Sequence, residues 1–123
     1  MTDADPNSLD DLIALVRGFA DDRDWNQFHT PRNLILALAG EVGELAATLQ
    51  WVSDSEVSEW LKSSDNRSQF EAELADVFSY LLRLADQTKV DLVEALRAKV
   101  LVNELRYPQN RSRGSSGKYT NYE

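Results

Sequence analysis

Two pairs of acidic residues have the spacing of a carboxylate-lined metal site. Glu41 and Glu44 lie three positions apart in the run GEVGELAATLQW, and Glu73 and Asp76 lie three apart in EAELADVFSYLL. Residues three apart share one face of an α-helix, so each pair would direct two carboxylates the same way. Four such oxygen donors suit a hard cation, and two facing helices could hold it inside a bundle. The spacing therefore predicts a Mg²⁺ site.

The neighbours of Glu41 bear on this prediction, because acidic pairs also occur on the solvated faces of helices. In a helix, Glu41 shares its face with Leu34, Ala37, Leu38 and Leu45, which form an apolar stripe. A charge buried on such a stripe is costly unless it has a partner or a metal. A metal site and a structural buried carboxylate both explain the pattern, and the sequence leaves both open.

Helical periodicity predicts that an all-α, four-helix-bundle-like fold positions these carboxylates. The main helices are expected at residues 8–22, 30–50, 67–87 and 91–107, with one short helix in the polar connection 51–66. Ser8, Thr30 and Asp91 are the expected N-caps. The chain has no alternating strand pattern, no repeat and no heptad run.

Composition excludes several classes of function. A chain of 123 residues is about one domain, and its net charge of −8 argues against binding to nucleic-acid polymers or anionic membranes. With no cysteine, a disulfide framework, a zinc-thiolate site and a thiol nucleophile are excluded. The start, MTDADPNS, does not resemble a leader, and no run approaches about 18 apolar residues. We therefore expect a cytoplasmic protein.

The end of the chain differs from the rest. We predict one all-α domain over residues 1–108 and a flexible tail over residues 109–123, which contains glycine, serine and three basic residues against one acidic residue. The tail could be a solubilising appendage. It could instead be a mobile arm whose cations, Lys118 among them, close over phosphates.

Four stretches carry a resemblance to a known family. RDWNQFHTPRNLILALAGEVGELAATLQW, EAELADVFSYLLRLAD, AKVLVNELRYP and KYT resemble the dCTP pyrophosphatases of the all-α NTP pyrophosphohydrolase (MazG-like) superfamily, over about residues 9–122. The resemblance implies a helical bundle that oligomerises, as a tetramer of tight dimers. It also implies Mg²⁺-dependent cleavage of dCTP or a modified dCTP to dCMP and diphosphate, which would clean the nucleotide pool.

The same resemblance assigns roles to individual residues. Glu41, Glu44, Glu73 and Asp76 match the metal ligands that carry the chemistry. On the substrate side, Trp51 matches a position beside the base, Tyr80 one beside the sugar, and Lys99 and Asn103 further substrate positions; Trp25 is another base-packing candidate. Aromatic faces can stack on bases for about 1–3 kcal/mol. Ordinary core packing, or a solvated helix face for Lys99, is the alternative for each.

Two positions limit how far the resemblance extends to substrate choice. Val16 stands where vertebrate-type dCTP enzymes have a substrate-contacting histidine, so the base and sugar preference stays open. His29, the only histidine, is expected to be a structural hydrogen-bonding residue rather than a general base. The alternative functions are pyrophosphohydrolysis of another non-canonical NTP, or a non-catalytic helical interaction module whose stability is indifferent to Mg²⁺.

Overall fold

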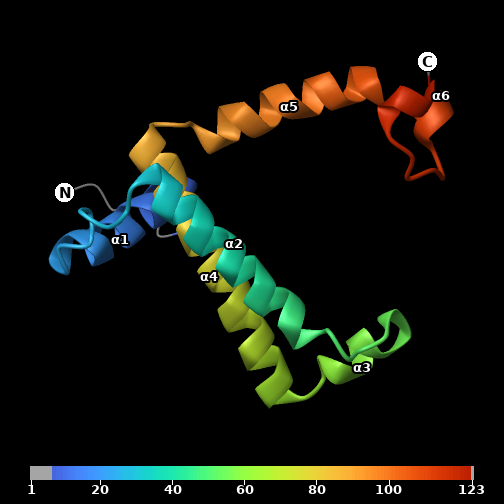
Figure 1. Ribbon diagram of the computed structural model, residues 1–123. Coiled ribbons are helices and arrows are strands. Elements are labelled where there is room, and N and C mark those ends of the chain that lie inside the picture. Colours follow the sequence, from blue (N-terminus) through green and yellow to red (C-terminus); the bar gives the residue numbers. More distant parts are fainter. Residues whose placement is uncertain (1–6, 123) are drawn as a thin grey trace. The chain divides into compact units, whose positions relative to one another are not determined.

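The computed structural model describes residues 7–122, and every regular element in that range is helical (Figure 1). The all-α class predicted from the sequence is thus confirmed. No described helix is long and apolar enough to cross a membrane. The elements are α1 (Leu9–Asp22), α2 (Pro31–Thr48), the 3₁₀ turn η1 (Asp54–Glu56), α3 (Val57–Trp60), α4 (Ser64–Thr88), α5 (Leu92–Arg106), α6 (Gln109–Ser112) and the 3₁₀ turn η2 (Tyr119–Tyr122).

The starts of three helices are fixed by the capping residues expected from the sequence. Ser8, Thr30 and Asp91 each accept a hydrogen bond from the backbone N–H three positions on, at 3.1–3.2 Å. Each bond satisfies an amide that has no partner inside the helix. α4 begins three residues earlier than predicted because the Ser63 side chain accepts from the Asn66 backbone N–H.

The described residues form two compact units, which divide between Lys89 and Val90. In the first unit α4 packs against both α2 and α1 (Figure 1). The apolar core of this unit is small and contains one buried apolar residue from α1, one from α2 and two from α4. They are Ala20, Leu34, Leu82 and Ala85. The division predicted after residue 108 stays a prediction.

The second unit contains α5 and the segment that follows it. The Tyr107 and Tyr119 rings meet edge to face with their centroids 6.0 Å apart, and the Arg106 guanidinium lies 4.7 Å from the centre of the Tyr119 ring. The segment from residue 107 on therefore has local structure that its glycine and serine content did not indicate. α5 itself contains no buried residue, and Leu105 is 83% exposed.

Candidate functional site

The packing of α2 on α4 brings three of the predicted metal ligands together. Glu41 on α2 and Glu73 and Asp76 on α4 each offer a carboxylate oxygen, and the three oxygens lie within 4.8 Å of one another. We call these three residues the acidic cluster. Glu44, the fourth predicted ligand, lies beside the cluster on α2 and is exposed, as Asp76 is. The facing arrangement of two helices that the spacing required is therefore present in the fold.

The acidic cluster is electrostatically strained without a cation. Burial raises the pKa of the Glu41 carboxyl, and the negative charges of Glu44 and Asp76 raise it further. The pKa of Glu73 is raised by the same causes in the same order. Like charges and desolvation both favour the protonated form of a carboxyl group.

The same two glutamates carry oxygen atoms without a partner. Among the described residues, nothing donates a hydrogen bond to the buried Oε2 atoms of Glu41 and Glu73. A buried acceptor without a donor costs free energy, and a bound divalent cation would satisfy both oxygens. The donor set, oxygen-only and negatively charged, fits such a cation.

A cavity of about 490 Å³ adjoins the acidic cluster. Asp76 belongs to both, so the cavity and the cluster form one continuous site. The volume is in the range of pockets that hold small-molecule ligands. The wall is mainly apolar and aromatic and is formed by Leu15, Val16, Phe19, Ala20, Trp25, His29, Asp76, Ser79, Tyr80 and Arg83.

Four rings line this cavity one after another. The centroids of Phe19 and Trp25 are 5.6 Å apart, those of Trp25 and His29 6.0 Å, and those of His29 and Tyr80 6.5 Å. Trp25 and Tyr80, both predicted substrate-side residues, are thus brought to one cavity. Phe19 and His29 were not predicted to line it. The ring faces provide surfaces on which a nucleobase can stack.

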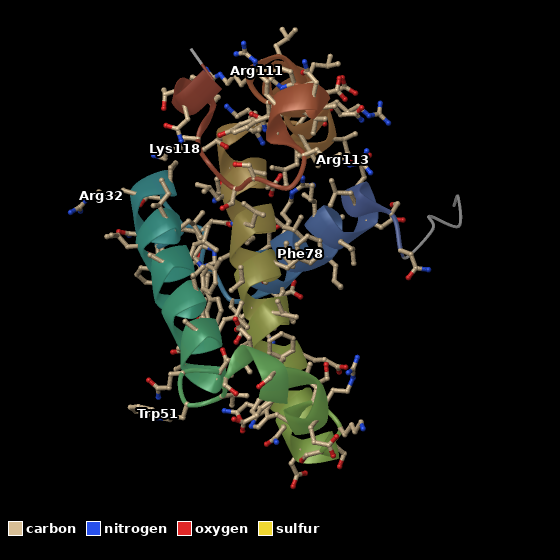
Figure 2. The ribbon with its side chains drawn as sticks, turned by 90° about the vertical axis from the view of Figure 1, so that its right-hand side faces the viewer. Arg32, Trp51, Phe78, Arg111, Arg113 and Lys118 are labelled. Carbon is tan, nitrogen blue, oxygen red and sulfur yellow. The ribbon has the colours of Figure 1, made fainter. Side chains whose placement is uncertain are left out.

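The remaining predicted residues lie elsewhere in the chain. Trp51 follows the end of α2, is 89% exposed and projects away from α4 (Figure 2). Lys99 and Asn103 lie on α5 and Lys118 follows α6, so all three belong to the second unit. The substrate contacts of these four residues therefore stay predictions.

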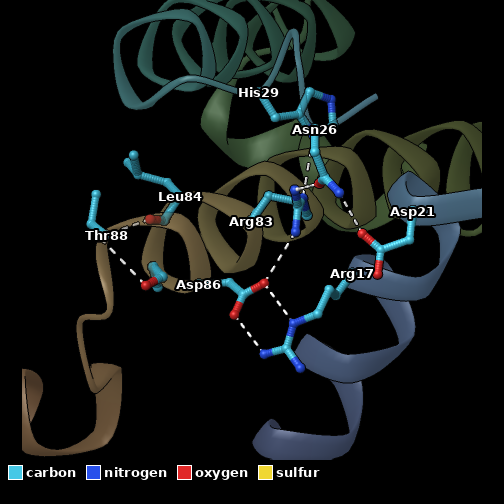
Figure 3. A network of polar contacts seen from close by, with 9 residues as sticks. Arg17, Asp21, Asn26, His29, Arg83, Leu84, Asp86 and Thr88 are labelled. Atoms are coloured by element: carbon cyan, nitrogen blue, oxygen red, sulfur yellow. Dashed lines mark hydrogen bonds and ion pairs between the residues drawn. The ribbon is translucent and has the colours of Figure 1, made fainter. Parts of the chain in front are cut away.

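A buried arginine organises the polar wall of the cavity. The Arg83 side chain is 4% exposed and donates to His29 Nδ1 at 3.2 Å, to Asn26 Oδ1 at 2.7 Å and to Asp86 Oδ2 at 3.1 Å (Figure 3). Asp86 also receives two hydrogen bonds from Arg17 on α1, at 2.6 and 2.9 Å. The hydrogen bond from Arg17 is the largest cause that lowers the pKa of Asp86.

The spacing of polar residues in the sequence could have indicated that Arg83 lines the cavity. Asp76, Ser79, Tyr80 and Arg83 follow the helical intervals of three, four and seven residues, so they share one face of α4. All four line the cavity. A polar row within the mainly apolar stretch 74–85 of α4 thus indicates the wall of a site.

Comparison with known proteins adds independent evidence. No family model matches the chain. Curated relatives are dCTP pyrophosphatase 1 of Bos taurus, 48% identical over 113 residues (92% of this chain, 67% of the relative), and that of Mus musculus, 49% identical (92% and 66%). The chain spans about two thirds of the length of these relatives. A solved pyrophosphatase structure from Archaeoglobus fulgidus superposes with a TM-score of 0.77 at 35% identity, covering 88% of this chain and 99% of that one.

Proposed function

Because this chain belongs to the dCTP pyrophosphatase family of all-α nucleoside triphosphate pyrophosphohydrolases, we propose that it hydrolyses dCTP or a modified dCTP to dCMP and diphosphate. The observation that carries the proposal is the position of Asp76, which is shared by the acidic cluster and the aromatic cavity. A nucleotide could place its base among the rings while its phosphates reach the carboxylates. Removal of surplus or modified nucleotide from the pool would be the biological use.

The acidic cluster would hold the metal. Glu41, Glu73 and Asp76 supply the oxygen donors, and Glu44 beside them can complete the set or orient the attacking water. Bound Mg²⁺ would neutralise phosphate charge and favour ionisation of a water molecule. A carboxylate at this site would accept one proton from the attacking water as the water oxygen bonds to phosphorus. The P–O bond between the attacked phosphorus and the oxygen that bridges the α- and β-phosphorus would break, so that dCMP and diphosphate leave.

The cavity residues would bind and orient the nucleoside. Trp25 offers a ring face for the base and Tyr80 a ring and a hydroxyl near the sugar, and we propose Trp51, Lys99 and Asn103 as further contacts on the basis of the family resemblance. A protein catalyses phosphoryl transfer mainly by holding the substrate in one orientation and by neutralising charge on the phosphates.

The choice between nucleotides depends on the cavity wall. Val16 lines the cavity and has no hydrogen-bonding group, so a contact that the family makes with a histidine is replaced by an apolar surface. Hydrolysis of another non-canonical nucleoside triphosphate is therefore the alternative within the same reaction class.

A homo-oligomer is part of the proposal, as a tetramer of tight dimers. The chain by itself leaves large apolar side chains exposed, among them Ile35 and Leu36 on α2 and Leu96 and Leu101 on α5. Large apolar side chains left exposed on each unit favour an interface. Light scattering at micromolar concentration should give a multiple of the chain mass, and a monomeric mass would contradict the proposal. The cytoplasmic location expected from the sequence stays a prediction.

The activity is tested with a panel of canonical and modified deoxynucleoside triphosphates, each with Mg²⁺ or with EDTA. The highest kcat/KM is expected for dCTP or a modified dCTP, with no turnover in EDTA. Asp76→Asn should abolish turnover while the protein stays helical. Asp65→Asn is the matched control, because Asp65 is exposed on the same helix and lies outside the cluster and the cavity. Absence of turnover with every triphosphate would favour the non-catalytic interaction module.

A further inference from the structure

The single histidine has one ring nitrogen occupied by a fixed donor. Arg83 Nε donates to His29 Nδ1 at 3.2 Å (Figure 3). An arginine has no acceptor and keeps its protons, so Nδ1 must present a lone pair to it. A neutral imidazole carries only one N–H group, which must then be on Nε2. The Arg83 contact therefore selects one tautomer of His29.

The charge state of His29 agrees with this assignment. Burial lowers the pKa of the His29 imidazole, and the positive charge of Arg83 lowers it further. Protonation would also place a hydrogen on Nδ1, directly against the guanidinium. The neutral ring is thus the form that this environment favours at neutral pH.

The Nε2–H group is left available in the cavity wall. His29 lines the cavity between the rings of Trp25 and Tyr80. The ring hydrogen bond that His29 makes with a described residue is at Nδ1, with Arg83. A donor on a residue that lines a largely apolar cavity is the kind of group that orients a bound ligand.

The turn that carries His29 is held in place from three sides. The His29 backbone N–H donates to the Trp25 carbonyl at 3.1 Å, and the Asn33 side chain donates to the Phe28 carbonyl at 3.0 Å. Arg83 reaches the same turn through the Asn26 side chain. The position of the imidazole relative to α4 is thus determined before any ligand binds, which lowers the entropy cost of using it.

We propose that His29 Nε2–H donates a hydrogen bond to an acceptor on the nucleoside part of the substrate, and that Arg83 is the positioning residue that holds His29 in this tautomer. The inference rests on the proposed nucleotide hydrolysis and names one further contact in that site. The acceptor belongs to the base or the sugar. His29 lies between Trp25, the proposed contact of the base, and Tyr80, the proposed contact of the sugar.

Two substitutions separate the two nitrogens of the ring. His29→Asn keeps an acceptor close to the position of Nδ1 and loses the donor at Nε2. His29→Gln reaches the position of Nε2 with an amide N–H. For a non-hydrolysable α,β-methylene analogue of dCTP, the asparagine variant should bind about 2- to 10-fold more weakly, the effect of losing one neutral hydrogen bond. The glutamine variant should bind within about 2-fold of the wild type, a range smaller than one such bond.

The direct test is nitrogen NMR of ¹⁵N-histidine-labelled wild type. One histidine gives two ring signals that need no assignment by mutagenesis. The free protein should show a protonated Nε2 and an unprotonated Nδ1, the saturating analogue should shift the Nε2 signal, and Arg83→Lys should weaken the preference for one tautomer. A proton on Nδ1, an Nε2 signal unchanged at saturation, or equal affinity in both His29 variants would overturn the proposal.

The outcomes also separate this inference from the activity itself. If the wild type turns over dCTP but the Nε2 signal does not shift when the analogue binds, only the proposed role of His29 is contradicted. If neither binding nor turnover is found, the proposed function fails, and the inference fails with it. Should the asparagine variant not fold, the NMR titration of the wild type decides: an Nε2 signal that shifts on binding supports the donor, and an unchanged signal at saturation contradicts it.

Discussion

Removing one charge from the acidic cluster should stabilise the metal-free protein. The pKa values of Glu41 and Glu73 are raised in the folded state, so the fold binds protons there more tightly than the unfolded chain does. Below about pH 4.3, the pKa of glutamate in the unfolded chain, these two groups make their full contribution to the free energy of unfolding. That contribution is lost as the pH rises through their raised pKa values in the folded protein. At pH 7 the ionised cluster therefore opposes folding, and Glu41→Gln should relieve part of that repulsion.

The size of the effect follows from the separation of the carboxylates. Two unit charges 4.8 Å apart repel by about 1 kcal/mol in a medium as polar as water. We use this lower limit for Glu41 and Asp76 because Asp76 is exposed and solvent screens the pair. For a chain of this length, about 1 kcal/mol corresponds to an increase in Tm of about 4 °C. The glutamine N–H can also donate to the oxygen of Glu73 that has no partner.

The assay is thermal unfolding by circular dichroism, in EDTA and in Mg²⁺, from pH 4 to pH 8. In EDTA at pH 7 the variant should be more stable than the wild type, and the difference should vanish near pH 4. In saturating Mg²⁺ the order should reverse, since a cation at 100 times its Kd stabilises the intact site by about 2.7 kcal/mol.

Glu71→Gln is the matched control. It lies on α4 in an exposed ion pair with Arg67, so its loss should lower stability by a few tenths of a kcal/mol at most and leave the Mg²⁺ response unchanged. A variant at Glu41 that is less stable than the wild type in EDTA would refute the charge repulsion. A full Mg²⁺ response in that variant would refute its role as a ligand.

Three further outcomes are expected. Trp25→Ala should weaken binding of a dCTP analogue by about 1–3 kcal/mol in titration calorimetry if its ring stacks on the base, and the exposed Trp51 should give a comparable loss only if it also reaches the base. In urea unfolding at pH 7, Asp86→Asn should lower the free energy of unfolding by about 3 kcal/mol, because it leaves the buried Arg83 charge without its partner. Arg17→Met, at the half-exposed end of the same network, should lower it by less than about 1 kcal/mol. Because the pKa of Asp86 is lowered, its contribution is complete above about pH 4 and is lost as the pH falls through the lowered value. Deleting residues 111–123 should leave helicity and Mg²⁺ binding intact but lower kcat/KM if the tail closes over phosphates, and unchanged kinetics would make it a solubilising appendage.

Local signals predicted the helices well. A cap such as Thr30 acts on an amide three residues away, so its effect can be read from neighbouring residues alone. The early start of α4 was missed because Ser63 lies in a run of polar residues where several could have served as the cap. The 3.6-residue period also placed Glu41 and the Glu73/Asp76 pair on helix faces that meet.

The long-range parts of the site could not be predicted in the same way. Arg83 contacts residues 54 and 57 positions away, and Arg17 contacts Asp86 across 69 positions. Such contacts depend on how helices pack, which the periodicity of one helix does not determine. For the same reason spacing could not show that Glu44 would lie more exposed than Glu41, although both share a helix face.

The central claim is that the acidic cluster and the ring-lined cavity act together to split a nucleoside triphosphate between its α and β phosphates. It is tested most directly by ³¹P NMR of the full chain incubated with dCTP and Mg²⁺. We predict that the dCTP signals are replaced by those of dCMP and diphosphate in equal amounts, and that Asp76→Asn gives neither product. The appearance of dCDP and inorganic phosphate, or no reaction in the folded wild-type protein, would contradict the claim.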